Sequence, residues 1–244
     1  MKTSGLILRA LLLITLSNLL FIPPARVEKA IVHGILFYLP SCQNCQKVIN
    51  DPQTQNDPPI FILKFLQDPI ANSIAIIVLV LMIISVIFSG YRFINPRSSP
   101  NIKISGWSIS ILCILGLGVA GYLTYVEITQ SKAICGPIGN CNSVQQSPYA
   151  KLFGVLPVGV LGMIGYLGII IVWITWWFGS KNLKNITSQV MWGMALLGTL
   201  FSIYLTFLEP FIIGATCAWC ITSAILITVI LVITTFFTDQ SALE

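Results

Sequence analysis

Two cysteines near the C-terminus have the spacing of a redox pair. They belong to Cys217-Ala218-Trp219-Cys220, at the start of a long apolar stretch. Two thiols three positions apart can close a small disulfide ring and reopen it easily, which favours electron exchange over simple cross-linking. The alternatives are a structural disulfide or half of a zinc site. Zinc would need a second pair of ligands and the chain has one histidine, His33, so we expect no metal site.

The other five cysteines form two further pairs and one single residue. Cys42 and Cys45 make a second C-x-x-C, Cys135 and Cys141 lie six positions apart, and Cys113 lies alone among apolar residues. Three close pairs are unusual for a reducing cytosol unless they bind metal or exchange electrons. We interpret Cys113 as a small packing residue.

The composition is that of an integral membrane protein. Of 244 residues, 56% are hydrophobic and only 9% are charged, and the mean hydropathy is +0.89. In a soluble protein about a quarter of the residues are charged. The net charge of +5 comes without a cluster of basic residues interleaved with aromatics, so we expect no nucleic acid as a partner.

Five apolar stretches have the length that crosses a hydrocarbon core of about 30 Å. They are residues 71–91, 106–126, 155–177, 189–211 and 217–237. Residues 1–25 carry a shorter apolar run behind two basic residues, which is typical of a signal peptide or signal anchor. We expect an all-α membrane protein with a four-helix transmembrane bundle at 106–237, an additional span at 71–91 and an extracytoplasmic segment at 26–70.

The charges of the connecting segments predict the orientation of these spans. One face receives seven basic and two acidic residues, including Arg97, Lys181 and Lys184, and the other face receives six of each. Connections rich in Lys and Arg stay in the cytoplasm. The three cysteine pairs then share the outer face, which we expect to be the periplasmic or lumenal side of the membrane, most simply a bacterial inner membrane.

A weak internal repeat connects the two outer loops. The sequences Tyr-Leu-Thr-Tyr-Val-Glu and Tyr-Leu-Thr-Phe-Leu-Glu end at Glu127 and Glu209, and each Glu comes eight residues before a cysteine, Cys135 or Cys217. Two parallel copies of a helical hairpin would produce this pattern, and so would chance similarity between apolar helices. Small residues in the spans 155–177 and 189–211 predict close helix packing, with room for a flat ligand as the alternative.

Together, these features resemble the vitamin K epoxide reductase family of membrane oxidoreductases over about residues 106–237. The resemblance rests on the loop from Cys135 to Cys141, the six-residue step from Cys141 to Ser147, the following Leu-Phe-Gly, and the C-x-x-C at the outer start of the last span. In that family a four-helix bundle holds a quinone beside the C-x-x-C. Electrons enter through the loop pair from a thioredoxin-like partner.

The resemblance implies a role for each matched residue. Cys135 would face the partner, Cys141 would pass electrons to Cys217, and Cys220 would be the thiol nearest the quinone, with Ser147 beside it. The quinone would be ubiquinone, menaquinone, plastoquinone or phylloquinone. Because the positive end of a helix stabilises a thiolate, we expect Cys220 to benefit from the start of the last helix.

One position departs from the family's vertebrate members. They have a Tyr four residues after the second Cys of the C-x-x-C, and this chain has Ala224. The difference favours a bacterial-type quinone reductase over epoxide reduction.

Residues 32–48, with Cys42 and Cys45, resemble the first strand, active-site turn and first helix of a thioredoxin fold. Only about twenty-five residues separate Cys45 from the next span, too few for a complete domain, and Pro58-Pro59 argues against one long helix there. An accessory redox role and a relic disulfide are both open for this pair.

We therefore expect a quinone-dependent thiol–disulfide oxidoreductase that takes electrons from protein thiols outside the cytoplasm and so promotes disulfide bond formation. Its partners would be a thioredoxin-like protein or domain and membrane lipid. The alternative is a non-catalytic transporter or receptor whose outer disulfides are structural. Transporters usually carry charges or broken helices within the membrane, and the four core spans have no Lys, Arg or Asp in their middle.

Overall fold

The computed structural model describes residues 64–95, 106–135, 139–152 and 156–243. Most of them belong to the long helices α5 (Pro69–Ile94), α6 (Trp107–Thr129), α8 (Val158–Phe178), α9 (Lys181–Leu208) and α10 (Ala218–Leu243). The shorter elements are α7 (Cys141–Gln145), the 3-10 turn η2 (Pro148–Ala150), the strands β1 (Lys151–Leu152) and β2 (Leu156–Pro157), and the π-turn η3 (Glu209–Ile213). The expected signal segment and the stretch with Cys42 and Cys45 lie outside the described residues.

The five spans expected from hydropathy are confirmed. The described part of the chain has five helices long and apolar enough to cross a membrane, and each contains most of one expected span. Four of the five helices are longer than the expected spans, and the largest differences are that α9 begins at Lys181 and α10 continues to Leu243. Only Gly179 and Ser180 separate α8 from α9, so the basic residues expected in that connection lie in the first turns of α9.

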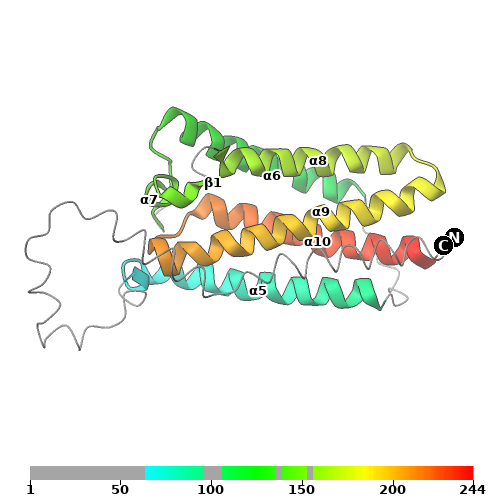
Figure 1. Cartoon of the computed structure of the whole chain (residues 1–244), viewed down its shortest axis with the longest axis horizontal. Helices are drawn as coiled ribbons and strands as arrows, with labels where there is room; N and C mark the ends of the chain where they lie inside the picture. Colours follow the sequence, from blue (N-terminus) through cyan, green and yellow to red (C-terminus); the bar gives the residue numbers. More distant parts are fainter. Residues whose placement is uncertain (1–63, 96–105, 136–138, 153–155, 244) are drawn as a thin grey trace, which may run out of the picture. The chain divides into compact units, whose positions relative to one another are not determined.

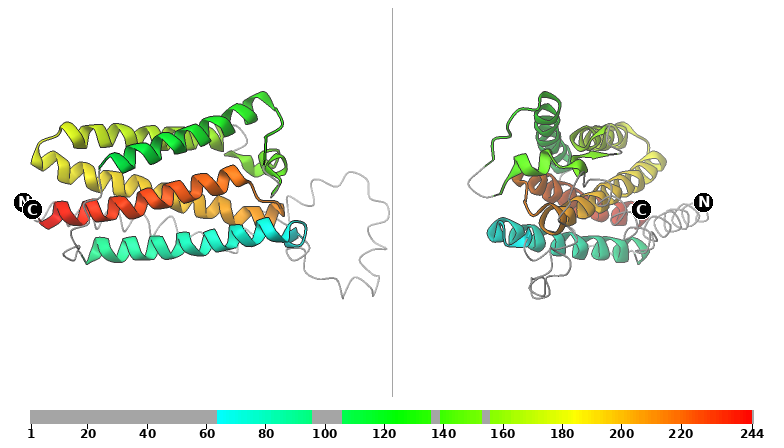
Figure 2. Two further views of the ribbon diagram at one scale, coloured as in Figure 1. Left: turned by 180° about the vertical axis from the view of Figure 1, so that it is seen from behind. Right: turned by 60° about the vertical axis from the view of Figure 1, so that its left-hand side comes forward.

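The helices form two groups, α6 with α8 and α5 with α9 and α10, which meet where α8 packs on α9 and α6 packs on α10. Helix α6 packs against α8, and α10 contacts α6, α9 and α5 (Figure 1). Helix α5 lies against α9 and α10, on the side of them away from the α6–α8 pair, in each view of Figures 1 and 2. The additional span is therefore an integral part of the helix packing.

Small residues bring α6 and α8 close together. A Cβ atom at Gly159 would lie 2.6 Å from Oγ1 of Thr124, and one at Gly116 would collide with the ring of Tyr166. The Tyr166 hydroxyl lies 3.1 Å from the backbone oxygen of Ser223, which connects α8 to α10 and satisfies a polar group within the membrane. The expectation that small residues serve helix packing is confirmed for this pair.

The two cysteine-containing loops lie at one end of the bundle. The end of α6, the starts of α5, α8 and α10, and the π-turn after α9 all meet there (Figures 1 and 2). At the opposite end, Trp107, Trp173 and Trp177 pack together, and the Lys184 ammonium lies 5.5 Å from the centre of the Trp176 ring. Aromatic and basic residues of this kind are typical of a membrane–water interface.

Candidate active site

The loop between α6 and α8 carries a disulfide. Cys135 and Cys141 are bonded, with their Cα atoms 6.0 Å apart. Cys141 is the first residue of α7, and the side chain of Asn140 caps this short helix by accepting a hydrogen bond from the backbone N–H of Ser143. Cys141 is fully buried, whereas Cys135 is only partly buried. The pair expected from the spacing therefore has one inner and one outer member.

Glu209 fixes the linker that leads into the C-x-x-C. Helix α9 ends in the π-turn at this residue, and Gly214, with φ +81°, then turns the chain back toward α10. The backbone oxygen of Glu209 accepts from the N–H groups of Gly214 and Ala215, at 2.8 and 3.2 Å. Its carboxylate accepts from the N–H of Cys217 at 3.3 Å.

The two thiols of the C-x-x-C have different surroundings. Cys217 immediately precedes α10 and is fully buried, and its Sγ accepts the backbone N–H of Cys220 at 3.4 Å. The start of the helix therefore stabilises Cys217, and not Cys220 as the sequence had led us to expect. The pKa of Cys217 lies below its ordinary value, chiefly because the Cys220 thiol donates to its sulfur. Hydrogen bonds from the backbone of Trp219 and the side chain of Gln145 also lower this pKa, and burial raises it.

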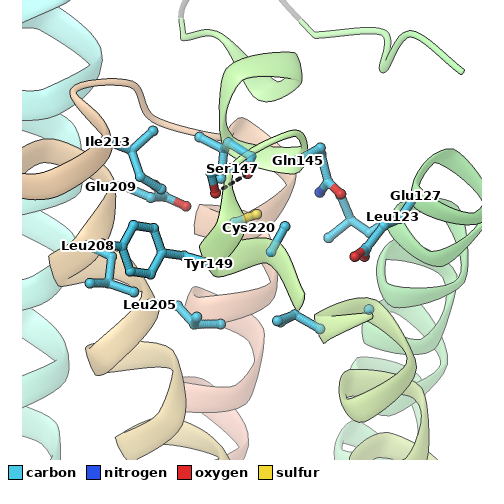
Figure 3. A pocket seen from close by; sticks show the side chains of 14 residues that line it. Leu123, Glu127, Gln145, Ser147, Tyr149, Leu205, Leu208, Glu209, Ile213 and Cys220 are labelled. Atoms are coloured by element: carbon cyan, nitrogen blue, oxygen red, sulfur yellow. Dashed lines mark hydrogen bonds between the residues drawn. The ribbon is translucent and has the colours of Figure 1, made fainter. Parts of the chain in front are cut away.

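A small cavity opens beside the second thiol. Its volume is about 50 Å³, and Cys220 and Ser147 both lie on its wall (Figure 3). The Ser147 hydroxyl donates to the backbone oxygen of Val144 at 2.7 Å. The wall is otherwise mostly apolar, and it is completed by Leu123, Glu127, Val144, Gln145, Tyr149, Ala150, Val158, Gly159, Leu205, Leu208, Glu209 and Ile213. The two residues that the family resemblance assigns to a quinone site thus line one cavity.

Two buried carboxylates also line this cavity. Glu127 is 5% exposed and Glu209 is 2% exposed, and they come from α6 and from the end of α9. The repeat in the sequence drew attention to both residues through their equal spacing to a cysteine, but sequence reasoning did not assign them to the site. That equal spacing was the signal that could have found them.

The disulfide loop lies directly against the C-x-x-C. The backbone N–H of Asn140 donates to the oxygen of Thr216 at 3.0 Å, and the indole N–H of Trp219 donates to the oxygen of Ile134 at 2.9 Å. A Cβ atom at Gly139 would lie 2.5 Å from the Thr216 oxygen, so only glycine permits this approach. The two cysteine pairs are neighbours although Cys217 comes seventy-six positions after Cys141 in sequence.

The first turn of α5 holds both segments in place. Asp68 caps α5 through one carboxylate oxygen and accepts the N–H of Gly139 at 3.2 Å through the other. Asn72 accepts from the hydroxyl of Thr216 at 2.8 Å, and the Lys64 ammonium donates to the backbone oxygen of Ile212. Sequence reasoning treated this helix only as an additional span and missed these contacts.

The fold and the site define a membrane protein in which two neighbouring cysteine pairs lie at one end of a helical bundle, next to a cavity. Residues 107–235 match the model of the vitamin K epoxide reductase family. This match covers more than half of the chain, and the protein belongs to that family. The match leaves α5 outside, and membership identifies the protein as an oxidoreductase in general terms.

Proposed function

We propose that this protein is a quinone-dependent thiol–disulfide oxidoreductase. It would take electrons from protein thiols outside the cytoplasm, pass them through Cys135/Cys141 and Cys217/Cys220, and deliver them to a membrane quinone, so that disulfide bonds form in the donor proteins. One observation carries the proposal. The C-x-x-C contacts both the disulfide loop, which is hydrogen-bonded to Thr216 and Trp219, and the cavity, which Cys220 lines.

The chemistry of the cavity wall suits a quinone ring. Apolar side chains from α6, α8 and α9 would contact its carbon atoms, and the hydroxyls of Ser147 and Tyr149 are groups that can bond to its oxygens. The present volume of about 50 Å³ is well below the roughly 300 Å³ of a small ligand pocket, so the wall must open to admit the ring. When bound, a quinone accepts two electrons and two protons.

The thiols would exchange electrons by attack on a disulfide sulfur. With Cys217 and Cys220 oxidised and the loop pair reduced, the Cys141 thiolate attacks Cys217 and releases Cys220 as a thiolate, which takes up the proton that Cys135 loses. Cys135 then attacks Cys141, which closes the loop disulfide and releases Cys217 as a thiolate. A sulfur with a lowered pKa is the better leaving group, so the surroundings of Cys217 favour this second step.

The donor thiols would reach the loop pair through Cys135, which is partly buried and so the more accessible member. A thioredoxin-like protein or domain outside the membrane is the class of donor that we propose, with Cys42 and Cys45 as an accessory pair. The basic connections of the chain support an orientation with both cysteine loops on the outer face, periplasmic in a bacterial inner membrane.

The test is electron transfer from a dithiol to a quinone by purified protein. We expect Cys217→Ala and Cys220→Ala each to abolish quinone reduction and disulfide formation in exported proteins. Cys113→Ala, at a buried free thiol within α6, is the matched control and should retain both activities. Full activity of Cys220→Ala would remove the basis of the proposal. Structural disulfides in a transporter or receptor would instead give no quinone reduction with the unmodified protein.

A further inference from the structure

Two carboxylates face the Cys220 thiol across the cavity. Figure 3 shows Glu209 and Glu127 on opposite sides of the Cys220 sulfur in this view. The Glu209 carboxylate accepts the backbone N–H of Cys217 at 3.3 Å and lines the same cavity as the Cys220 thiol. Glu127 has one buried carboxylate oxygen, Oε1, with no hydrogen-bond partner among the described residues. One carboxylate is thus bonded to the backbone of the C-x-x-C beside the reacting thiol, and the other is available to a group in the cavity.

A purely structural role at the ends of α6 and α9 accounts poorly for the acidic side chains of Glu127 and Glu209. A carboxylate buried near the end of a membrane span costs free energy unless a cation or several hydrogen bonds compensate it. A glutamine at position 209 could accept the Cys217 N–H equally well without that cost. Within the described residues, Lys151 acts on Glu127 only through its charge, and no ion pair connects it to either carboxylate. The presence of a carboxyl group, and not a neutral amide, at these two positions therefore requires an explanation.

The proton balance of the reaction supplies one. Oxidation of two thiols to a disulfide releases two electrons and two protons, and a quinone takes up the same numbers. Cys217 is surrounded by donors that favour its thiolate, so when Cys217 has already lost its proton, only Cys220 brings one to the final step. A second protonatable group must then hold the other proton beside the cavity.

We propose that Glu209 and Glu127 are the two proton-carrying groups of this site. Glu209 accepts the proton of the Cys220 thiol as the bond between Cys217 and Cys220 forms. Glu127 holds the second proton, equivalent to the one that Cys217 has lost. The two electrons pass from the sulfur atoms to the quinone, and both protons go to the same acceptor. This inference therefore rests on the proposed function, because the quinone is where the protons end.

Other charged and titratable groups near the pair come from every neighbouring element. They are Cys217 and Cys220 at the start of α10, Lys64 and Asp68 before α5, and Tyr149 and Lys151 between α7 and α8. Lys64 and Asp68 are bonded to backbone groups of Ile212 and Gly139. This leaves Glu209 as the carboxylate bonded to the backbone of the C-x-x-C.

The decisive measurement is infrared difference spectroscopy of the protein without quinone, as a chemical oxidant converts the two thiols of the C-x-x-C to the disulfide. The band of a protonated carboxylic acid should appear on oxidation, because Glu209 keeps the proton when no acceptor is present. Glu209→Gln should lose this band, Glu209→Asp should retain one, and Glu127→Gln should leave it unchanged. A merely structural role for Glu209 would produce no such band.

Turnover with quinone provides the second readout. General acid–base groups typically contribute 10²- to 10⁴-fold to a rate. We expect Glu209→Gln and Glu127→Gln each to lower kcat by about 100-fold or more, with little change in KM for the quinone. Lys132→Gln changes one exposed charge at the same end of the bundle and should leave kcat unchanged.

The outcomes separate the two proposals. If the protein reduces no quinone but shows the oxidation-linked band, the proposed function is wrong and proton uptake by Glu209 stands. If the protein reduces quinone, shows no band, and Glu209→Gln turns over normally, the role of Glu209 is overturned while the function stands. Normal turnover of Glu127→Gln would overturn the role of Glu127.

Discussion

Removing one hydrogen-bond acceptor from Asp68 should loosen the disulfide loop without damaging α5. The residue uses one carboxylate oxygen for the helix cap, on the N–H of Ala71 at 3.3 Å, and the other for the N–H of Gly139 at 3.2 Å. Asparagine caps a helix about as well as aspartate, but its amide nitrogen cannot accept from Gly139. Asp68→Asn therefore separates the two contacts, and Asp68→Ala removes both.

The expected magnitudes follow from these two contacts. A hydrogen bond to a charged group contributes about 1.5–3 kcal/mol, and we take about 1 kcal/mol here because Asp68 is partly exposed and the bond is long. Losing the cap costs about 1 kcal/mol more. Asp68→Asn should then weaken the hold on Gly139 by about 1 kcal/mol, and Asp68→Ala should cost about 2 kcal/mol in total. At 1.4 kcal/mol per factor of ten, the first value is roughly a fivefold change in local opening.

Hydrogen exchange measured by mass spectrometry reads this change directly. Peptides that contain Gly139 should exchange about five times faster in Asp68→Asn than in the unmodified protein, while peptides from the first turn of α5 should change only in Asp68→Ala. Ser73→Ala is the control, because the Ser73 hydroxyl bonds within α5 to Pro69 and touches neither cysteine segment. Unchanged exchange at Gly139 in both Asp68 variants would refute the argument that α5 holds the loop.

Two further predictions concern topology and the order of the relay. In a cysteine-free background, a single cysteine at position 132 should react with an impermeant maleimide added from outside, and one at position 181 should not. The reason is that basic connections stay in the cytoplasm. The reverse labelling pattern would show that the orientation is inverted. The double variant Cys135→Ser, Cys220→Ser should trap a Cys141–Cys217 disulfide, detectable by mass spectrometry of peptides, because the resolving thiols are gone. A trapped bridge from Cys135 to Cys217 in the matching Cys141→Ser variant, with none from Cys141, would show that the relay runs in another order.

The fold was predictable where apolar length alone decides the structure. Each transmembrane helix contains a long apolar stretch, and such a stretch has few alternatives to a helix in a membrane. Hydropathy does not report where a helix continues beyond the apolar region, so the start of α9 at Lys181 was missed. The π-turn at Glu209–Ile213 was missed because it follows from how the end of α9 turns back to α10, and no local pattern indicates that.

The site was predictable only where the spacing of residues in the sequence itself indicates their chemistry. The cysteine pairs were found because short spacings between thiols have few other uses. The contacts of Asp68 with Gly139 and of Asn72 with Thr216 join residues 71 and 144 positions apart, so no sequence window contains them. The spans are apolar around their whole circumference, and their sequences therefore do not indicate which side chains face the cavity.

Glu127 and Glu209 end two similar segments, and their different hydrogen bonds explain why the cysteine pairs that follow have different surroundings. Glu209 anchors the residues that follow it through its backbone oxygen and its carboxylate, so Cys217 is held tightly at the start of α10. The backbone oxygen of Glu127 instead accepts from the side chain of Gln130, and α6 ends there in a left-handed residue that leads into a loop. The cysteine eight residues after Glu209, Cys217, is consequently fixed and buried at the start of α10, whereas Cys135, eight residues after Glu127, lies partly exposed on a loop. A fixed inner pair and an accessible outer pair are what the relay that we propose, from a protein donor to a membrane acceptor, requires.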